Sequence, residues 1–523
     1  MRLVTTAQMR ELDRRTIEEA GTSGEILMDR AGFGVADAVS RLSSSINFND
    51  ALIHIIAGRG NNGGDAFATA RQLKEMGFDV AVWLACAANE IKDDALKHFS
   101  RMKAAQVSVD ELPTKEDWDE ARNAPYTTDI IVDGVLGIGS TGPARGPAAG
   151  AIEYINAQCR DAFVVSIDIP SGLNADSGVA EGAAVHADIT VTMGLPKRGL
   201  VESSALDYVG TIEVVDIGIP FDFIAHLPPD DAKELIYLHD LKPMFPRRLR
   251  DSHKGNYGHV LLIGGAKSYA GAIAMAARAA VRSGAGLVTV LAPESIVPIV
   301  AAACLESMVV GGRETVKGSL SAEVWPEWRN RIDDFDAVLI GPGLTRHDES
   351  LALVRRVIRE CTVPLVLDAD AISVLEGQPE WVEKAHCPVV MTPHPGELSR
   401  LFSEDIEKVQ KDRWGVALAA SKFTRATVIL KGAGTVVAQD GKPLAINMTG
   451  NPGMATGGTG DVLAGLLTGL LGQGLAPYDA ARAAVYLHGR AGDMAAWRKT
   501  QAGIVAGDVI EEIPFVFRDV TLR

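Results

Sequence analysis

The chain repeats one local pattern, in which a short apolar run ends in a glycine-rich loop and a helical pattern follows. In the first half, Leu52–Ala57 is followed by the loop Gly58–Asp65, by an expected helix over Ala66–Met76 and by a second apolar run over Val80–Leu84. Strands joined by helices in this order are typical of a parallel sheet covered by helices on both faces. The pattern therefore predicts a three-layer α/β fold.

The same pattern starts again after residue 255. His259–Ile263 runs into two glycines, a helix is expected over Ala270–Ser283, and further strands are expected at 287–291, 337–340, 364–367, 389–391 and 427–430. A chain of 523 residues is too long for one hydrophobic core. Between Pro220 and Pro246 the pattern weakens into proline-rich and charged sequence. We therefore predict one domain at 1–225, a linker at 226–240 and a second domain at 241–523.

The amino-acid composition argues against some classes of binding partner. The formal net charge of −16 argues against a nucleic-acid-binding protein, because phosphate backbones are bound by clustered Lys and Arg. The five cysteines are widely spaced and contain no CxxC pair, which favours a reducing cytoplasm. The N-terminal region lacks the apolar core of a signal peptide, and no apolar run approaches the ~20 residues needed to cross a bilayer. We expect a cytoplasmic homo-oligomer that binds small molecules, with neither nucleic acid nor a membrane as partner.

Three loops of the first half should meet at one edge of its sheet. Gly58–Asp65 joins a strand to a helix, so its N–H groups could cradle an anion. The alternative is a tight turn in which Asp65 only caps the helix. A second glycine-rich loop, Gly137–Gly146, follows a strand that ends at Asp133, and Asp168–Gly172 follows the next strand. Because parallel strands share one carboxyl edge, these loops predict a ligand site there.

These motifs resemble the YjeF N-terminal domain over roughly residues 1–225, through Asn61–Asp65, Val132–Gly134, Gly137–Gly142 and Ser166–Gly172. Such domains are NAD(P)HX epimerases, which interconvert the R and S forms of a nicotinamide ring hydrated at C6. The resemblance implies a substrate site made of Asn61, Asn62, Gly63, Gly64, Asp65, Gly137, Ile138, Gly139, Ser140, Thr141, Gly142, Pro143 and Asp168. It also implies a potassium ion held by Asn62, Asp133 and Ser171, since hard oxygen ligands suit such a cation.

Asp168 is the predicted catalytic acid/base group of this first site. Moving protons at a ring carbon requires a titratable side chain within hydrogen-bond reach. The alternative is that Asp168 only caps the turn after its strand.

The most specific motif of the second half is Asn451–Asp461, which runs directly into an apolar helical pattern. Unhindered N–H groups at Gly458–Gly460 and the helix dipole can stabilise a transferring phosphoryl group, and Asp461 could accept the proton of the attacking hydroxyl. The alternative is a flexible loop capped by Asp461. Upstream, a strand ends at Lys431 in a glycine loop suited to a nucleotide phosphate, while the chain has neither a Walker A loop nor a protein-kinase signature.

Together with Thr392–Glu397, these residues resemble the ribokinase-like superfamily and, within it, NAD(P)H-hydrate dehydratases, over roughly residues 235–515. The expected fold is then Rossmann-like or ribokinase-like in both domains. The resemblance implies ADP as phosphoryl donor, accompanied by Mg²⁺, with the AMP portion bound by Lys431, Gly432, Ala433, Gly434, Thr435 and Gly460. It implies contacts to the hydrated nicotinamide from Ala272, Gly343, His394 and Asp461, with Asp461 catalytic. His394 could instead be a satisfied turn histidine.

Both resemblances together imply one chain that epimerises R- and S-NAD(P)HX and dehydrates S-NAD(P)HX to NAD(P)H, releasing AMP and phosphate; the substrates are NADHX and NADPHX. In one alternative, the second half is a ribokinase-like small-molecule kinase that leaves the phosphate on its substrate. In another, the first half is a non-catalytic binding module. Asp133 and Asp168 beside both glycine loops disfavour that reading, as does the acidic charge.

Overall fold

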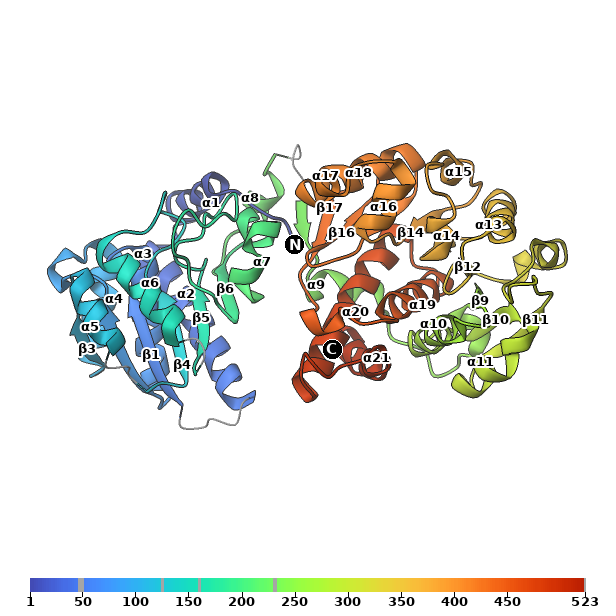
Figure 1. Cartoon of the computed structure of the whole chain (residues 1–523). Helices are drawn as coiled ribbons and strands as arrows, with labels where there is room; N and C mark the ends of the chain where they lie inside the picture. Colours follow the sequence, from blue (N-terminus) through green and yellow to red (C-terminus); the bar gives the residue numbers. More distant parts are fainter. Residues whose placement is uncertain (46–50, 124–126, 159–160, 229–232, 522–523) are drawn as a thin grey trace. The chain divides into compact units, whose positions relative to one another are not determined.

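The structure is a computed structural model that describes residues 1–45, 51–123, 127–158, 161–228 and 233–521. It divides into two compact units, Met1–Ala232 and Lys233–Arg523, each built around its own sheet (Figure 1). The division falls inside the segment 226–240 that was predicted to be a linker, of which 229–232 lie outside the described residues. The prediction is wrong for part of that segment, because Lys233–Leu235 form strand β8 of the second sheet.

The first unit contains a parallel sheet of seven strands in the order β3-β2-β1-β4-β5-β6-β7. The strand order reverses between β1 and β4, and ligands of doubly wound sheets bind beyond the carboxyl ends of the strands at such a point. The strands are β1 (Leu52–Ala57), β2 (Asp79–Leu84), β3 (Ser108–Glu111), β4 (Ile130–Gly134), β5 (Phe163–Ile167), β6 (Ile189–Met193) and β7 (Thr211–Val215).

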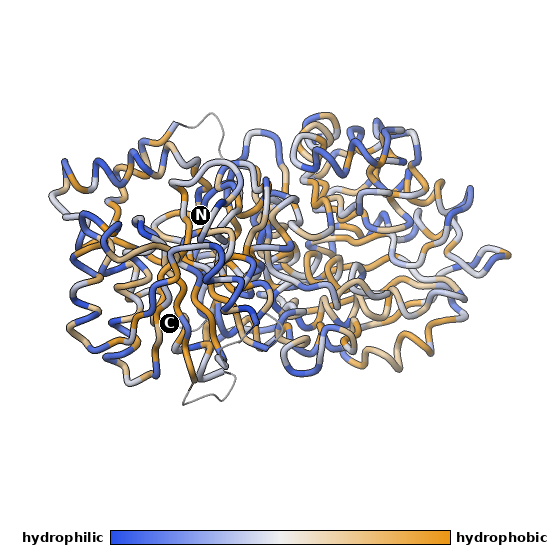
Figure 2. Tube along the Cα trace, turned by 60° about the vertical axis from the view of Figure 1, so that its left-hand side comes forward, coloured by the Kyte–Doolittle hydropathy of each residue, from blue (hydrophilic) through white to orange (hydrophobic). Residues whose placement is uncertain are grey.

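Both faces of this sheet are buried, as parallel strands require. Ile55 packs against helices α1 to α4 on one face, and the next residue, Ile56, packs against α5 and α6 on the other. The helices are α1 (Thr6–Glu18), α2 (Gly24–Ser45), α3 (Asn61–Glu75), α4 (Asp93–Ala104), α5 (Lys115–Asn123), α6 (Gly146–Gln158), α7 (Leu206–Val209) and α8 (Phe221–Ala225). Figure 2 shows the result as hydrophobic stretches inside the unit and hydrophilic stretches outside.

The second unit contains a ten-stranded sheet in the order β11-β10-β9-β12-β13-β14-β15-β16-β17-β8. It is parallel from β11 to β15, and β16 pairs antiparallel with both of its neighbours. Here the strand order reverses between β9 and β12. The strands are β9 (His259–Ile263), β10 (Leu287–Pro293), β11 (Met308–Gly312), β12 (Ala337–Ile340), β13 (Leu365–Leu367), β14 (Val389–Met391), β15 (Thr427–Leu430), β16 (Thr435–Ala438) and β17 (Leu444–Asn447).

Helices again cover both faces of the second sheet. On one side lie α10 (Ala270–Arg282), α19 (Thr459–Gly472), α20 (Pro477–Arg498) and α21 (Ala506–Thr521). On the other lie α13 (Asp348–Glu360), α16 (Pro395–Phe402) and α18 (Arg413–Thr424). The shorter helices are α9 (Leu238–Leu241), α11 (Val297–Ala303), α12 (Trp325–Arg329), α14 (Asp370–Ser373), α15 (Glu380–Glu383) and α17 (Ile406–Lys411).

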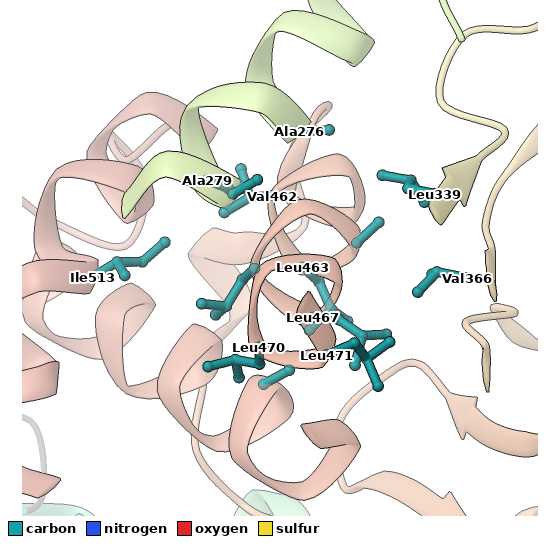
Figure 3. Packing of buried hydrophobic residues seen from close by; sticks show 14 of the residues in the cluster. Ala276, Ala279, Leu339, Val366, Val462, Leu463, Leu467, Leu470, Leu471 and Ile513 are labelled. Carbon is teal, nitrogen blue, oxygen red and sulfur yellow. The ribbon is translucent and has the colours of Figure 1, made fainter. Parts of the chain in front are cut away.

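Helix α19 is buried over most of its length. Its side chains pack between Ala276 and Ala279 of α10, Ile513 of α21 and the sheet (Figure 3). Gly465 lies directly against the Ala276 carbonyl, where a Cβ would overlap the oxygen, so α19 and α10 approach closely. This packing fixes the N-terminus of α19, where the Asn451–Asp461 motif ends.

The predicted three-layer α/β class is confirmed for both units. One local prediction is wrong: α3 begins at Asn61 instead of Ala66, so most of the expected loop is the first turn of the helix. The described cysteines Cys86, Cys304, Cys361 and Cys387 are free, and Cys159 lies outside the described residues. Among the residues that the structure describes, no helix is both long and apolar enough to cross a membrane.

Candidate active sites

A cavity of about 900 Å³ opens in the first unit beyond β1 and β4, at the point where the strand order reverses. This volume is in the upper range of small-molecule sites. The predicted substrate residues that line it are Asn61, Asn62, Asp65, Gly137, Ile138, Gly139, Ser140, Thr141, Gly142, Pro143 and Asp168. The structure therefore brings together the three loops that the sequence analysis singled out.

Two predicted substrate residues, Gly63 and Gly64, are buried and do not line the cavity. A Cβ on Gly63 would overlap the Gly58 carbonyl oxygen, and one on Gly64 would lie 2.5 Å from the sulfur of Met28. The Gly64 N–H already donates to the Gly60 carbonyl. These glycines let the helix start lie tight against the strand end, which is a structural task.

Helix α3 presents its N-terminus to the cavity through Asn61 and Asn62. Its cap position is Gly60, and within the described residues no side chain caps it, so the alternative in which Asp65 serves as the cap is wrong. Because the first N–H groups of a helix lack intrahelical acceptors, this end can receive an anionic group of a ligand.

Asp168 lies immediately after β5 and its carboxylate is held from the neighbouring strand. Oδ1 accepts hydrogen bonds from Lys197 Nζ, from the Met193 N–H at 3.1 Å and from Thr192 Oγ1 at 3.2 Å. Its φ of +66° is uncommon for a residue with a side chain and costs about 1–3 kcal/mol. These hydrogen bonds and the buried ion pair with Lys197 hold the strained residue so that its carboxylate lies at the wall of the cavity.

Among the charged residues of this cavity that sequence reasoning missed are Asp13 and Lys197, which lie within electrostatic reach of Asp168. Asp13 comes from α1, and the Lys197 side chain is only 1% exposed. Burial, opposed by Lys197 and reinforced by Asp168, raises the pKa of Asp13 to about 6. Burial and the charges of Asp168 and Asp13 also raise the pKa of Asp65 well above its ordinary value. No local motif marks Asp13 or Lys197 in the sequence. The local signal at each position is a charged residue next to an apolar segment.

The predicted potassium ligands form one hydrogen-bonded cluster beside the cavity. Ser171 Oγ lies 2.5 Å from Asp133 Oδ1, and the Ser171 N–H and Ser166 Oγ donate to Asp133 Oδ2 at 2.9 and 2.8 Å. Asn62 Nδ2 donates to the Leu136 carbonyl at 2.9 Å, and the Leu136 N–H donates to Ser171 Oγ at 2.8 Å. Burial raises the pKa of Asp133, although these hydrogen bonds oppose the shift.

In the second unit, Gly343 and Ala272 lie together beyond β9 and β12. Gly343 has a φ of +65°, and a Cβ there would lie 2.7 Å from the Tyr269 carbonyl oxygen and 3.2 Å from the Ala272 Cβ. Only glycine fits this position without strain. Gly343 and Ala272 therefore pack closely together at the point where the strand order reverses.

A charged cluster faces the start of α19. Lys431 Nζ donates to Asp368 Oδ1 at 3.0 Å and lies 3.8 Å from Glu397 Oε2. Burial works against the charge of Lys431, but Asp368 and Glu397 outweigh it, so its pKa is raised. Thr392 Oγ1 also donates to Asp368 Oδ1, at 2.6 Å. Lys431, which directly follows β15, therefore contacts the buried carboxylate of Asp368, which directly follows β13.

Asp461 stands in the first turn of α19 and does not cap it; the cap position is Gly458, and among the described side chains none bonds to this helix end. Burial, with Asp368 adding to it and Lys431 opposing it, raises the pKa of Asp461 to about 7. A carboxylate with this pKa exchanges a proton readily near neutral pH. Lys431 is close by, since a Cβ on Gly460 would lie 3.5 Å from Nζ.

His394 has the structural role that its alternative reading proposed. Its Nδ1 accepts from the N–H groups of Gly396 and Glu397, and the Glu397 carboxylate accepts from the His394 N–H at 2.8 Å, which caps α16. The side chain is half exposed, and Nε2 lies 3.6 Å from Glu397 Oε1. Capping orients the ring and leaves its outer edge accessible.

The predicted nucleotide loop joins β15 to β16. Gly432 has a φ of +134° and Gly434 a φ of +62°, and Thr435 Oγ1 donates to the Gly432 carbonyl at 2.7 Å. Gly432 and Ala433 are exposed. Arg413 stabilises the start of the loop by donating hydrogen bonds to the Leu430 and Lys431 carbonyls at 3.1 and 3.2 Å. Sequence reasoning did not identify Arg413, which lies 18 residues upstream of Lys431.

The Asn451–Met454 turn is anchored to α20 by the partly buried carboxylate of Asp493. Asp493 accepts from the Gly450 N–H and from Asn451 Nδ2, both at 3.0 Å. Burial raises the pKa of Asp493, while these two hydrogen bonds oppose the shift. This anchor precedes the segment that carries Gly458–Asp461, and it was also missed in the sequence.

Comparison with known proteins assigns the two units to two family models. Residues 24–199 match the YjeF-related protein N-terminus, and residues 260–515 match NAD(P)H-hydrate dehydratase. The chain is similar to the bifunctional NAD(P)H-hydrate repair enzyme Nnr of Moorella thermoacetica, with 38% identity over 99% of this chain and 97% of that protein. It is 36% identical to the protein of the same name from Coxiella burnetii, over 98% of both chains.

Among solved structures, the ADP/ATP-dependent NAD(P)H-hydrate dehydratase from Bacillus subtilis, co-crystallised with ATP and Mg²⁺, is 29% identical to this chain. The match covers 55% of this chain and 99% of that one, with a TM-score of 0.48. Independently of structure, the curated relatives correspond to the chain over nearly its whole length and include both units. The chain therefore belongs to the family of bifunctional NAD(P)H-hydrate repair enzymes.

Proposed function

We propose that the chain repairs hydrated NADH and NADPH in two steps, each carried out by one unit. The first unit interconverts the R and S epimers at C6, and the second unit dehydrates the S epimer to NAD(P)H with ADP as phosphoryl donor. The observation that supports this most is that each unit holds an acid group at its candidate site: Asp168 at the wall of the first cavity, and Asp461 in the first turn of α19 near Lys431 and Asp368.

In the first unit the substrate occupies the cavity lined by the Asn61 and Gly137–Pro143 segments. The N-terminus of α3 receives an anionic part of the dinucleotide, and the nicotinamide ring lies against Asp168. Because Lys197, Thr192 and Met193 all hold Oδ1, the second oxygen of Asp168 is the one that exchanges a proton with the oxygen substituent at C6. Gly63 and Gly64 act in this model by letting α3 begin close to β1.

The side chains of Asn62, Asp133 and Ser171 would hold a potassium ion. The cluster suits this ion because it offers carboxylate, hydroxyl and carbonyl oxygens around a buried acid. When bound, the ion supplies positive charge beside the Gly137–Pro143 loop. Asp133 already orders that loop in the structure, since Ser171 links its carboxylate to Leu136.

In the second unit, Asp461 accepts the proton of the C6 hydroxyl as that oxygen attacks the β-phosphate of ADP, and AMP leaves. The N–H groups of the Gly458–Gly460 turn stabilise charge on the phosphoryl group. The lone pair of the ring nitrogen then expels phosphate from C6, and loss of a proton from C5 restores the double bond. Phosphorylation is needed because hydroxide is a poor leaving group at neutral pH.

Other residues of the second site bind and position. The Lys431–Thr435 loop with Gly460 holds the AMP portion, with Mg²⁺ accompanying the phosphates, while Gly343, Ala272 and the outer edge of His394 face the hydrated ring. Lys431 connects the residues that hold the nucleotide with the residues that face the ring, because it neutralises Asp368 and lies beside Gly460. The alternative of a small-molecule kinase fused to a binding module is not favoured, since full-length relatives are repair enzymes.

The test uses purified full-length protein and a mixture of R- and S-NADHX. Recovery of the near-UV absorbance of the dihydronicotinamide is followed with ADP, with ATP and with neither nucleotide. We expect full recovery with ADP and release of equal amounts of AMP and phosphate. A stable phosphorylated product would instead establish the kinase alternative, and recovery of the S fraction alone would refute the role of the first unit.

A further inference from the structure

Helix α1 brings a carboxylate into the epimerase cavity that the proposed chemistry has not used. The helix starts at a capping box between Thr5 and Gln8 and buries Met9 and Leu12 against the rest of the unit. This orientation places Asp13 at the cavity wall, with Arg10 one turn before it. Asp13 Oδ1 is buried and accepts no hydrogen bond from the described residues.

The nearby lysine is already fully used. Lys197 Nζ has three protons, and the structure gives it three acceptors: Asp168 Oδ1, Thr192 Oγ1 at 3.1 Å and the Met193 carbonyl at 2.9 Å. Lys197 therefore attracts Asp13 only through its charge and donates no hydrogen bond to it. The two acids thus differ: Asp168 is held as an ion-paired carboxylate, and Asp13 is not.

Burial favours a proton on Asp13 more strongly than the neighbouring charges oppose it. Asp13, Asp65 and Asp168 are three acids within mutual influence, and Lys197 is the cation that acts on them. Burial disfavours the charged form of Asp13 and raises its pKa to about 6, although Lys197 opposes the shift; the negative charge of Asp168 adds to it. Asp13 can thus give up or take up a proton near neutral pH.

Inversion at C6 requires two proton transfers. C6 carries a hydroxyl and is bonded to the ring nitrogen, so the hydroxyl leaves as water when it receives a proton and the nitrogen lone pair forms a C6=N1 cation. Water then adds to the opposite face of C6 and gives up a proton. One acid and one base are needed, and each gains or loses one proton per turnover.

We propose that Asp13 is a second proton-transfer residue of the epimerase site, acting as the acid toward the C6 hydroxyl of the R epimer while Asp168 is the base. The inference rests on the proposed function of the first unit. In the R-to-S direction the Asp13 carboxyl protonates the leaving hydroxyl, and Asp168 takes the proton from the incoming water. After each turnover Asp168 releases its proton to solvent and Asp13 takes one up from solvent, so protons and atoms balance, and the S-to-R direction reverses both transfers.

The experiment follows R-NADHX by chromatography without nucleotide, so that the second unit is idle. The variant is Asp13→Asn, and the matched control is Glu11→Gln, an exposed carboxylate on the same helix that pairs with Arg14. We expect kcat/KM for R-to-S conversion to fall roughly 100-fold or more in Asp13→Asn and to stay unchanged in Glu11→Gln. Dehydration of the S epimer with ADP should be unchanged in both, which checks the integrity of each preparation.

The pH profile gives a second readout that a packing role would not change. For the wild type, kcat/KM in the R-to-S direction should fall as pH rises above about 6, because Asp13 loses the proton that it donates. The remaining activity of Asp13→Asn should lack this fall. The inference is overturned, while the proposed function stands, if the wild type epimerises R-NADHX and Asp13→Asn does so at the same rate. The same holds if kcat/KM of the wild type does not change between pH 5 and 8. Absence of epimerisation in the wild type would instead refute the proposed function.

Discussion

Replacing Asp461 with asparagine should stabilise the second unit at alkaline pH while abolishing dehydration. Burial raises the pKa of this carboxyl from 3.8 to about 7 in the folded protein. The folded state thus favours the neutral form. Its contribution to stability is complete below the unfolded pKa and is lost as pH rises through the folded pKa. Asparagine resembles the neutral form at every pH and avoids this loss.

The size of this stabilisation follows from the size of the pKa shift of Asp461. Three pKa units at about 1.4 kcal/mol each give a loss of about 4 kcal/mol above pH 7 and about 1.5 kcal/mol at pH 5. The advantage of Asp461→Asn over the wild type should therefore grow by about 2–3 kcal/mol between pH 5 and 8.5. In a unit of this size that corresponds to roughly 5 °C in Tm.

Differential scanning calorimetry of the full-length wild type and Asp461→Asn at pH 5 and 8.5 measures this difference. Asp251→Asn is the control, because Asp251 is an exposed carboxylate of the same unit. The control should show the same Tm difference from the wild type at both pH values. A Tm difference for Asp461→Asn that does not change with pH would refute the reasoning, since it would mean that the carboxyl titrates alike in the folded and unfolded chains.

Three further predictions concern the rest of the two sites. Lys197→Met should remove the buried partner of Asp168, lowering the free energy of unfolding of the first unit by about 3–5 kcal/mol and stopping epimerisation; unchanged urea unfolding would contradict this. Gly63→Ala should destabilise the first unit by about 1–3 kcal/mol, because its Cβ would overlap the Gly58 carbonyl, whereas Gly139→Ala, in an exposed loop with open space around it, should change stability by less than about 0.5 kcal/mol; equal Tm shifts would argue against the packing role. Asp493→Ala should slow dehydration of the S epimer by loosening the Gly450 turn and leave epimerisation intact, and an equal loss of both activities would count against it.

The sequence predicted the fold class and most strands correctly because buried parallel strands are continuous apolar runs. The expected strands at Leu52–Ala57, His259–Ile263 and Ala337–Ile340 match β1, β9 and β12 residue for residue. The start of α3 was wrong because Gly and Asn have low helix propensity, which tertiary packing of Gly63 against Gly58 overrides. Strand β8 was missed because three residues in a charged segment carry no detectable pattern.

The residues of the candidate sites also fall into those that the sequence alone could predict and those that it could not. Glycine-rich loops and acids at strand ends are visible locally, which is why the Gly137–Pro143 loop, Asp168 and Asp461 could be chosen from the sequence. Asp13 and Lys197 could not, since only the fold brings α1 and the segment after β6 to the same cavity. The capping role of His394 was open from sequence, because a histidine before proline fits both a turn and a ligand contact.

The central claim is that the first unit supplies the epimer that the second unit consumes. Its most direct test is to give wild-type protein and Asp168→Asn the same mixture of R- and S-NADHX with saturating ADP and to measure the final amount of NADH. The account predicts that the wild type converts the whole mixture, while Asp168→Asn converts the S fraction at the wild-type rate and the remainder only at the spontaneous rate of epimerisation. Complete conversion by both proteins with the same time course would contradict it.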